Sequence, residues 1–264
     1  MRIFSAVVAL PPTLAAIHFG SPYFEVFVAV GCAVLIWEWG RLCGRKAASI
    51  EVTVAGLCLI GAVLTAGLGH FDLGFAALGA GAVLAGVAAS LFGRAEASAG
   101  APWLSAGVLY IGIPVLSLVW LRDAAGRDAV YWLFALVWAT DTGAYAFGRM
   151  IGGPKLLPRV SPKKTWAGLI GGIICAGGVG AAFAFGIGQA AFWPLAVYSG
   201  FLAIVAQSGD LFESWVKRRF GVKDSGAIMP GHGGLLDRVD GLMAVAAVVA
   251  LVSLINRDNG LVWF

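Results

Sequence analysis

Charge is what this sequence has least of. Only 12% of its 264 residues are Asp, Glu, Lys or Arg, and 60% are hydrophobic. A soluble globular domain carries about a quarter charged residues. The deficit excludes an ordinary soluble domain and indicates an integral membrane protein.

Cysteine is also scarce, and its spacing carries no pattern. The four cysteines form no CxxC pair and have no His at ligand spacing, so we interpret all four as small core residues. The sequence contains no recognisable internal repeat, low-complexity tail or soluble domain. Its 38 glycines follow no collagen-like period and suit helices that pack closely in lipid.

Apolar segments fill most of the chain instead. Nine of them approach the ~20 residues that a helix needs to cross ~30 Å of hydrocarbon. We therefore expect an all-α integral membrane protein, a polytopic bundle of about nine transmembrane helices. The expected spans are residues 3–17, 23–40, 52–68, 73–92, 103–121, 129–148, 166–187, 191–207 and 241–255.

The first span has two interpretations. A basic start and a short apolar run are typical of a cleaved signal peptide, but Pro11 and Pro12 favour a retained, kinked span. With the N-terminus inside, the inner loops hold 15 of the 18 basic residues and the outer loops with the C-terminus hold three. This asymmetry predicts an inner N-terminus and an outer C-terminus.

Ionisable side chains concentrate in residues 207–241. Five of the 14 acidic and five of the 18 basic residues lie in this stretch, between two apolar segments. Asp237 and Asp240 are three residues apart and share a helix face. With Asp210 they predict an oxygen-rich site suited to Mg²⁺. The alternative for Asp237 is a helix cap.

Asp141 is the second feature. It precedes Arg149 by eight residues, which places it about 12 Å from the inner boundary of the membrane. A carboxylate at that depth faces protein or a water-filled cavity. The alternative is an ion pair or a hydrogen bond to Thr140 or Thr142. Glu25 and Glu38 lie near span ends and are interpreted as interfacial or pair-forming, with no role assigned.

Residues 159–166 form a third feature, because Thr165 can cap the helix that follows beside Lys163 and Lys164. A helix N-terminus next to two lysines suits an anion, and the alternative is an ordinary basic inner loop. In residues 230–234 the glycines allow the backbone to come close to a ligand. His232 in that stretch is more often a hydrogen-bonding residue than a catalytic one.

These residues carry a resemblance. Ser214-x-x-Lys217-Arg218, Lys223-Asp224-x-Gly226 and Pro230-Gly231-His232-Gly233-Gly234-x-x-Asp237-Arg238-x-Asp240 together resemble the signature of the phosphatidate cytidylyltransferase (CDP-diglyceride synthase) family. The stretches 141–149 and 161–168 are similar to the family as well. The resemblance covers roughly residues 138–241 by motif, and the N-terminal spans only in character.

The resemblance implies an activity and its setting. Such an enzyme is a nucleotidyltransferase of phospholipid biosynthesis, which converts CTP and phosphatidate into CDP-diacylglycerol and pyrophosphate. It implies Mg²⁺, a second, monovalent cation such as K⁺, a homodimer among membrane lipids, and no nucleic-acid partner. We expect a multi-pass protein of the cell inner (plasma) membrane with its active site on the cytoplasmic side. Residues 1–264 would form one polytopic domain, with N-terminal spans in 1–100 and catalytic spans in 101–264.

The resemblance also implies residue roles. Asp210 and Asp237 would hold the metal, with Asp240 supporting, while basic residues neutralise phosphates. The expected catalytic residues are Asp210, Asp237, Asp240, Lys217, Arg218 and Arg238. The expected substrate-binding residues are Ser161, Lys163, Lys164, Thr165, Asp141, Ser214, Lys223, Asp224, His232, Gly233 and Gly234.

Two rival functions can be distinguished. A transporter or channel would also show an intramembrane carboxylate and Gly-interrupted spans, but it predicts two related halves, and the sequence shows none. A membrane kinase of polyprenols would also use a nucleoside triphosphate, without a diacyl lipid.

Overall fold

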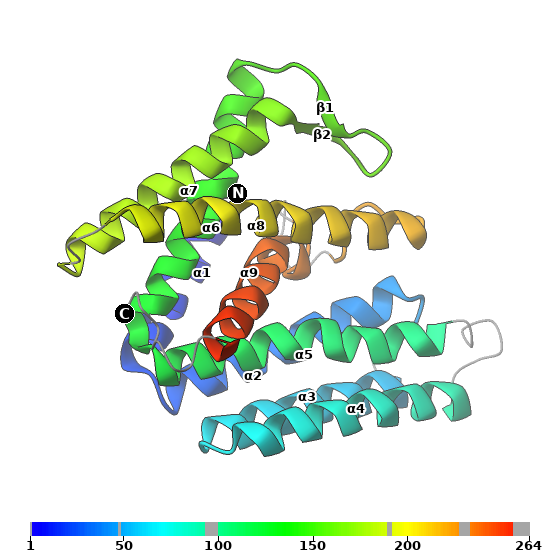
Figure 1. Cartoon of the computed structure of the whole chain (residues 1–264). Coiled ribbons are helices and arrows are strands. Elements are labelled where there is room, and N and C mark those ends of the chain that lie inside the picture. Colours follow the sequence, from blue (N-terminus) through cyan, green and yellow to red (C-terminus); the bar gives the residue numbers. More distant parts are fainter. Residues whose placement is uncertain (1, 47–48, 93–99, 189–191, 227–232, 256–264) are drawn as a thin grey trace. The chain divides into compact units, whose positions relative to one another are not determined.

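The computed structural model describes residues 2–46, 49–92, 100–188, 192–226 and 233–255 (Figure 1). Within these ranges the chain is helical apart from one small antiparallel sheet. The elements are α1 Arg2–Phe19, α2 Tyr23–Leu42, α3 Ile50–Gly67, α4 Phe71–Phe92, α5 Ala101–Ala124, α6 Gly126–Met150, β1 Lys155–Leu157, β2 Ser161–Thr165, α7 Trp166–Gly186, α8 Trp193–Arg219 and α9 Leu236–Ile255.

The expected fold class is confirmed. Each predicted span corresponds to one helix, and seven helices of the described ranges are long and apolar enough to cross a membrane, namely all except α1 and α6. The polar residues Thr140, Asp141 and Thr142 interrupt the apolar character of α6. The protein is therefore a polytopic helical membrane protein, and its two short strands are a minor addition.

Two connections differ from the prediction. In the predicted connection 208–240, α8 continues to Arg219, past the expected end of its span. The start of α9 at Leu236 agrees with the helical placement expected for Asp237 and Asp240. Low hydropathy after Gln207 marks the end of the apolar segment and not the end of the helix. An ion pair between Glu213 and Lys217, four residues apart, stabilises the polar extension of α8.

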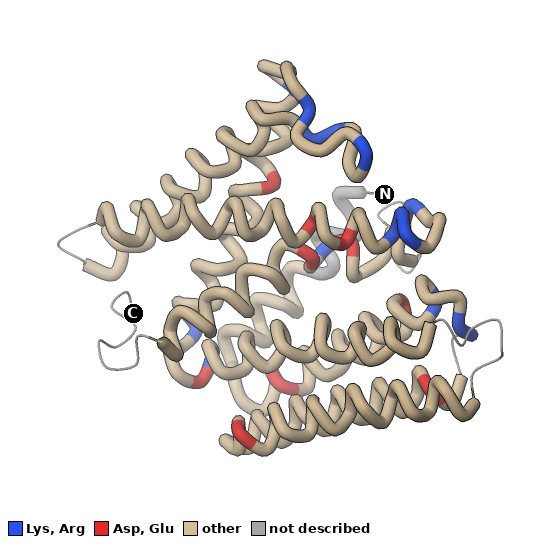
Figure 2. Tube along the Cα trace, turned by 45° about the vertical axis from the view of Figure 1, so that its right-hand side comes forward, with Lys and Arg blue, Asp and Glu red and all other residues tan. Residues whose placement is uncertain are grey.

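The second difference is the connection 151–165, which contains a β-hairpin. Strand β1 pairs with β2 in antiparallel register, with Lys155 opposite Thr165 and Leu157 opposite Ser161. The Cα trace of Figure 2, with Lys and Arg positions in blue, shows basic residues along this hairpin. The sequence missed it because these strands are short and polar, and one of them contains Pro162.

The chain divides into two compact units. Unit 1 comprises Met1–Asp123 with Arg219–Val239, and unit 2 comprises Ala124–Arg218 with Asp240–Phe264. The signature region is therefore divided: residues 219–239 belong to unit 1, and the residues on either side of them belong to unit 2.

Unit 1 contains α2, α3 and α4, which pack as sequence neighbours. Trp39 on α2 is buried and donates a hydrogen bond from Nε1 to the Trp103 carbonyl at 2.7 Å, while its ring fills the space beside Gly107. Arg45 and Glu51 form a buried ion pair at 2.7 Å. Burial raises the pKa of the Cys43 thiol to about 12, so it stays protonated near neutral pH.

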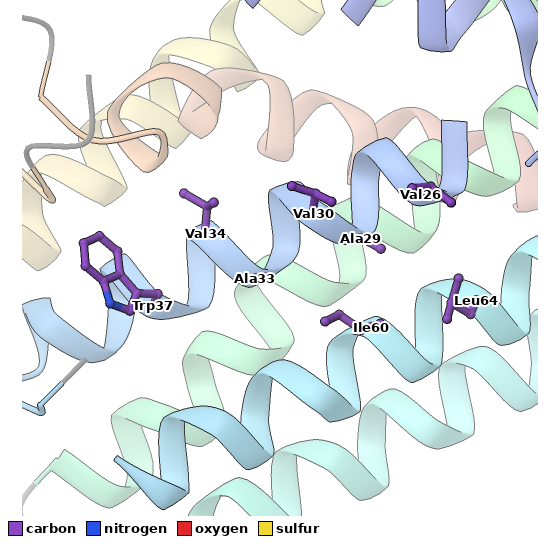
Figure 3. Close-up of a pocket in the computed structure, with 8 residues that line it drawn as sticks. All are labelled: Val26, Ala29, Val30, Ala33, Val34, Trp37, Ile60 and Leu64. Atoms are coloured by element: carbon purple, nitrogen blue, oxygen red, sulfur yellow. The ribbon is translucent and has the colours of Figure 1, made fainter. Parts of the chain in front are cut away.

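A cavity of about 630 Å³ lies along the α2–α3 face of unit 1 (Figure 3). Its lining is almost entirely apolar and includes no charged side chain, so it is unsuited to binding phosphate or metal. The lining residues are Val26, Ala29, Val30, Ala33, Val34, Trp37, Ile60 and Leu64.

In unit 2, α6 and α7 run side by side with glycine at their closest approach. A Cβ atom at Gly168 would lie 2.8 Å from the Ala144 carbonyl oxygen, so a larger residue would push the helices apart. The predicted cap of α7 is confirmed, because Thr165 Oγ1 accepts a hydrogen bond from Gly168 N at 3.1 Å. Strand β2 therefore leads directly into α7.

Candidate active site

Unit 2 brings three carboxylates together. Asp210 and Glu213 on α8 and Asp240 on α9 each offer an oxygen atom, and these oxygens lie within 4.8 Å of one another. Carboxylate oxygens are the ligands that Mg²⁺ and Ca²⁺ prefer in proteins. The carboxylate cluster, Asp210–Glu213–Asp240, could therefore hold a divalent cation.

Close contact between α8 and α9 positions the cluster. A Cβ atom at Gly209 would lie 2.7 Å from both the Asp240 carbonyl oxygen and the Ala244 Cβ. Only glycine permits this approach, and the next residue on α8 is Asp210. Glu213 follows one turn later on the same helix face.

Two lysines neutralise part of the cluster's charge. Lys164 Nζ on β2 lies 2.6 Å from Asp210 Oδ2, and Lys217 Nζ lies 2.6 Å from Glu213 Oε2. Two ionised carboxylates at this separation repel each other by about 3 kcal/mol at an effective dielectric constant of about 20. The cluster therefore depends on cations, which the lysines supply in this structure.

The remaining contacts of Asp210 and Asp240 are polar. Ser214 Oγ donates a hydrogen bond to Asp210 Oδ1 at 3.4 Å, and Gly241 N donates to Asp240 Oδ1 at 2.7 Å. Asp141 on α6 is close enough to Asp240 for their charges to repel each other. The neighbouring Thr140 donates its own hydroxyl to the Leu136 carbonyl at 2.8 Å.

In unit 1, Asp237 organises the signature loop, residues 225–226 and 233–235 in the described part. Its Oδ2 atom accepts hydrogen bonds from Gly234 N at 2.8 Å, from Ser225 Oγ at 3.0 Å and from Ser225 N at 3.1 Å. These donors precede Asp237 in the chain, whereas a helix cap accepts from the residues that follow it. Gly233 has a φ of +86°, and a Cβ atom there would lie 2.7 Å from Asp237 Oδ2.

The structure places the expected site residues in both units. Asp210, Asp240, Asp141, Ser214, Lys164 and Lys217 belong to unit 2, where Asp210 and Asp240 come together as expected. Asp237 lies in unit 1, and its metal-binding role stays a prediction. Several expected residues have exposed side chains without a role assigned by the structure: Lys163, Arg218, Lys223, Asp224 and Arg238. His232 lies outside the described residues.

Two glutamates join these sites without having been predicted. Glu213 completes the carboxylate cluster, and its spacing of three residues from Asp210 would have revealed it if α8 had been extended past Gln207. Glu38 on α2 binds the start of α9, through hydrogen bonds to Leu235 N and Leu236 N. No local pattern indicates a contact across so long a stretch of chain.

The fold defines a multi-pass helical membrane protein in which carboxylates of α8 and α9 lie together and pair with lysines of β2 and α8. Comparison with known sequences then identifies the family. The chain belongs to the cytidylyltransferase family, whose model matches residues 1–255. A cytidylyltransferase is a nucleotidyltransferase, so the resemblance and the enzyme class expected from the sequence are confirmed.

Individual relatives agree with this assignment. The chain is 42% identical over 270 residues to the phosphatidate cytidylyltransferase of Brucella suis biovar 1 (strain 1330), covering 97% of this chain and 94% of the relative. It is 41% identical over 169 residues to that of Rickettsia felis, covering 58% and 71%, respectively. For Staphylococcus saprophyticus subsp. saprophyticus the identity is 43% over 146 residues, covering 55% and 56%. The similarity to the Brucella protein thus extends through the N-terminal spans, beyond the motifs.

Proposed function

We propose that this protein is a CTP:phosphatidate cytidylyltransferase, which makes CDP-diacylglycerol and pyrophosphate for phospholipid biosynthesis. The observation that carries the proposal is 42% identity across 97% of the chain to a relative of that name. The carboxylate cluster and its lysines supply the chemistry that such a reaction needs. Family membership counts against both rival functions, the transporter and the polyprenol kinase.

The reaction is a nucleotidyl transfer. A phosphate oxygen of phosphatidate attacks the α-phosphorus of CTP, a new P–O bond forms, and the bond to the β-phosphate breaks to release pyrophosphate. Because the attacking oxygen is already anionic, no protein base is required. Catalysis then consists mainly of positioning and charge neutralisation.

The chain's own residues fit a divalent cation. Asp210, Glu213 and Asp240 present hard oxygen ligands within 4.8 Å of one another, and two of them pair with lysines, Asp210 with Lys164 and Glu213 with Lys217. Asp237 is proposed as a further ligand from the signature. When bound, Mg²⁺ would neutralise phosphate charge in the transition state. A monovalent cation such as K⁺ is proposed as a second ion.

The basic residues bind phosphate in this proposal. Lys164 forms an ion pair with Asp210, and only 15% of its side chain is exposed. In this proposal it exchanges the carboxylate for a phosphate oxygen with little movement. Lys217 has the same relation to Glu213. Lys163, Arg218 and Arg238 are exposed and are proposed to attract the nucleotide by charge.

The setting follows from the two substrates. Phosphatidate lies in the bilayer and CTP in the cytosol, so the site belongs at the cytoplasmic boundary of the inner membrane. The excess of basic residues in the predicted inner loops supports this orientation. We further propose a homodimer and one polytopic domain in the membrane.

One assay tests the function. Purified protein is incubated with labelled CTP, Mg²⁺ and phosphatidate in mixed micelles, and CDP-diacylglycerol is separated by chromatography. Diacylglycerol and a polyprenol replace phosphatidate in parallel reactions. We expect a labelled liponucleotide with phosphatidate alone. A phosphorylated polyprenol, or no lipid product under any condition, would contradict the proposal.

A further inference from the structure

Glu38 is a completely buried carboxylate on α2, far from the signature in sequence. Its Oε1 atom accepts a hydrogen bond from Leu235 N at 2.9 Å, and Oε2 accepts one from Leu236 N at 2.8 Å. The first N–H groups of a helix have no partner within the helix, and a negative charge there interacts favourably with the helix dipole. Glu38 therefore supplies the missing acceptors at the start of α9.

Two glycines of the signature loop are explained by the same carboxylate. A Cβ atom at Gly226 would lie 2.5 Å from Glu38 Oε1. One at Gly234 would lie 2.6 Å from Oε2 and 2.7 Å from Oε1. The backbone closes around Glu38 so tightly that only glycine fits at either position.

Ser225 connects Glu38 to Asp237. Its hydroxyl group lies 3.5 Å from Glu38 Oε2 and 3.0 Å from Asp237 Oδ2, and its backbone N–H also donates to Asp237. Gly234 N donates to Asp237 at 2.8 Å while the adjacent N–H of Leu235 donates to Glu38. The two carboxylates thus bind the same short backbone segments.

We propose that Glu38 is a positioning residue of the active site. It fixes the signature loop and the start of α9, and through them it sets the orientation of Asp237. The catalytic part of this inference rests on the proposed function, in which Asp237 binds the metal. The structural part, in which Glu38 holds the loop, is independent of that function.

Glu38→Gln is the primary variant, because it keeps the size of the side chain and replaces one acceptor oxygen with a donor that faces backbone N–H groups. Glu25→Gln is the matched control, since Glu25 is a buried glutamate on the same helix. Hydrogen exchange of the peptide containing Leu235 and Leu236 is measured by mass spectrometry. We expect at least ~10-fold faster exchange in Glu38→Gln, and wild-type rates in Glu25→Gln.

Kinetics separate positioning from simple stability. In the CTP and phosphatidate assay, Glu38→Gln should raise the Mg²⁺ concentration for half-maximal activity and lower kcat by ~10- to 100-fold per folded molecule, the usual range for residues that orient metal ligands. A residue that only stabilises the fold would change the melting temperature and the amount of active enzyme, but not the Mg²⁺ dependence.

Gly226→Ala provides a second variant that leaves Glu38 itself in place. Its new methyl group would displace the carboxylate, so we expect the same faster exchange and weaker Mg²⁺ response. Gly31→Ala on α2 is its control, because a Cβ atom there would meet nothing within 4 Å. This pair keeps the test valid if Glu38→Gln does not fold.

Each outcome has a defined meaning. Unchanged exchange at Leu235 and Leu236 in both variants would overturn the structural part. Faster exchange with an unchanged Mg²⁺ response and unchanged kcat would overturn the positioning role. An inactive wild-type protein would contradict the proposed function, while the exchange experiment would still decide whether Glu38 holds the loop.

Discussion

The carboxylates at the candidate site have different partners in the two units. In unit 2, Asp210 and Glu213 pair with Lys164 and Lys217, which are long, flexible side chains. In unit 1, Asp237 and Glu38 accept hydrogen bonds mainly from backbone N–H groups. A lysine can leave its partner when a metal ion or phosphate arrives, whereas a backbone donor cannot move without unfolding the loop.

This difference indicates two roles for carboxylate side chains in this protein. The carboxylates paired with lysine, Asp210 and Glu213, are suited to exchanging partners during binding, and those held by backbone N–H groups, Asp237 and Glu38, are suited to fixing a loop in place. Asp237 is the critical case, because the family signature marks it for metal binding while its observed partners hold the loop. The predictions below test this distinction, from the largest expected effect to the smallest.

Asp210→Asn is expected to have the largest effect. It removes a charge from the carboxylate cluster and the partner of Lys164, so activity should fall by ~10³-fold or more, as for loss of a central electrostatic group. Mg²⁺ should no longer raise the melting temperature, because a ligand stabilises a protein only by binding its folded state. Asp128→Asn, on an exposed residue of α6, is the control and should behave as wild type.

The companion variant Asp240→Asn should lose less activity than Asp210→Asn in the same assay. Asp240 Oδ1 already accepts a hydrogen bond from Gly241 N at 2.7 Å, so part of its role is met within its own helix. Full activity together with a normal Mg²⁺ shift in Asp210→Asn would mean that the cluster binds no catalytic ion.

Asp237→Asn tests whether one carboxylate both holds the loop and binds the metal. We expect loss of activity and loss of the Mg²⁺-induced rise in melting temperature in a protein that still folds, since an amide oxygen can accept some of the same hydrogen bonds. Thermal unfolding with and without Mg²⁺ measures this directly. If activity and the Mg²⁺-induced rise in melting temperature both persist, Asp237 only holds the loop and does not bind the metal.

Glu213→Gln tests the residue that the structure adds to the site. The change keeps volume and removes one negative charge next to Lys217, so we expect ~10- to 100-fold weaker activity and a higher Mg²⁺ requirement. Titration of activity against Mg²⁺ checks it, with the melting temperature as the measure of folding. An unchanged Mg²⁺ requirement would limit Glu213 to its ion pair with Lys217.

The helices could be predicted from the sequence because length and hydropathy alone decide which segments suit a bilayer. The same criterion could not follow α8 beyond Gln207, since helix formation continues in polar surroundings where hydropathy is low. Asp210 was recognised by its charge and its motif, but Glu213 was not, because a helix face exists only once the helix has been extended to include it.

Long-range contacts could not be predicted from the sequence for a different reason. Glu38 meets Leu236 across 198 positions, and Lys164 meets Asp210 across 46. Each pairing depends on how several helices pack, which no local periodicity encodes. The signature indicated candidate site residues, but it could not show that a glutamate of α2 lies against two of its glycines.

Lys164 and Lys163 offer the finest test, because they are adjacent and differ mainly in partner. Neighbouring residues of a strand point to opposite faces, and here Lys164 meets Asp210 at 2.6 Å while Lys163 is exposed. Lys164→Ala should lower kcat/KM for CTP by ~10- to 100-fold, as expected for loss of a charge-assisted hydrogen bond. Lys163→Ala should lower it by no more than ~5-fold, since exposed charges contribute little.

Ionic strength distinguishes the two roles further. Salt screens exposed charges over about 8–10 Å, so the effect of Lys163→Ala should shrink as salt is added, while that of the partly buried Lys164 should persist. Lys164→Arg is the control for charge, and it should recover only part of the activity because a planar guanidinium does not replace a compact ammonium group. Equal losses of kcat/KM in the two alanine variants would mean that the hairpin lysines act only through their general positive charge. Wild-type kcat/KM in both would leave its lysines a role in membrane topology alone.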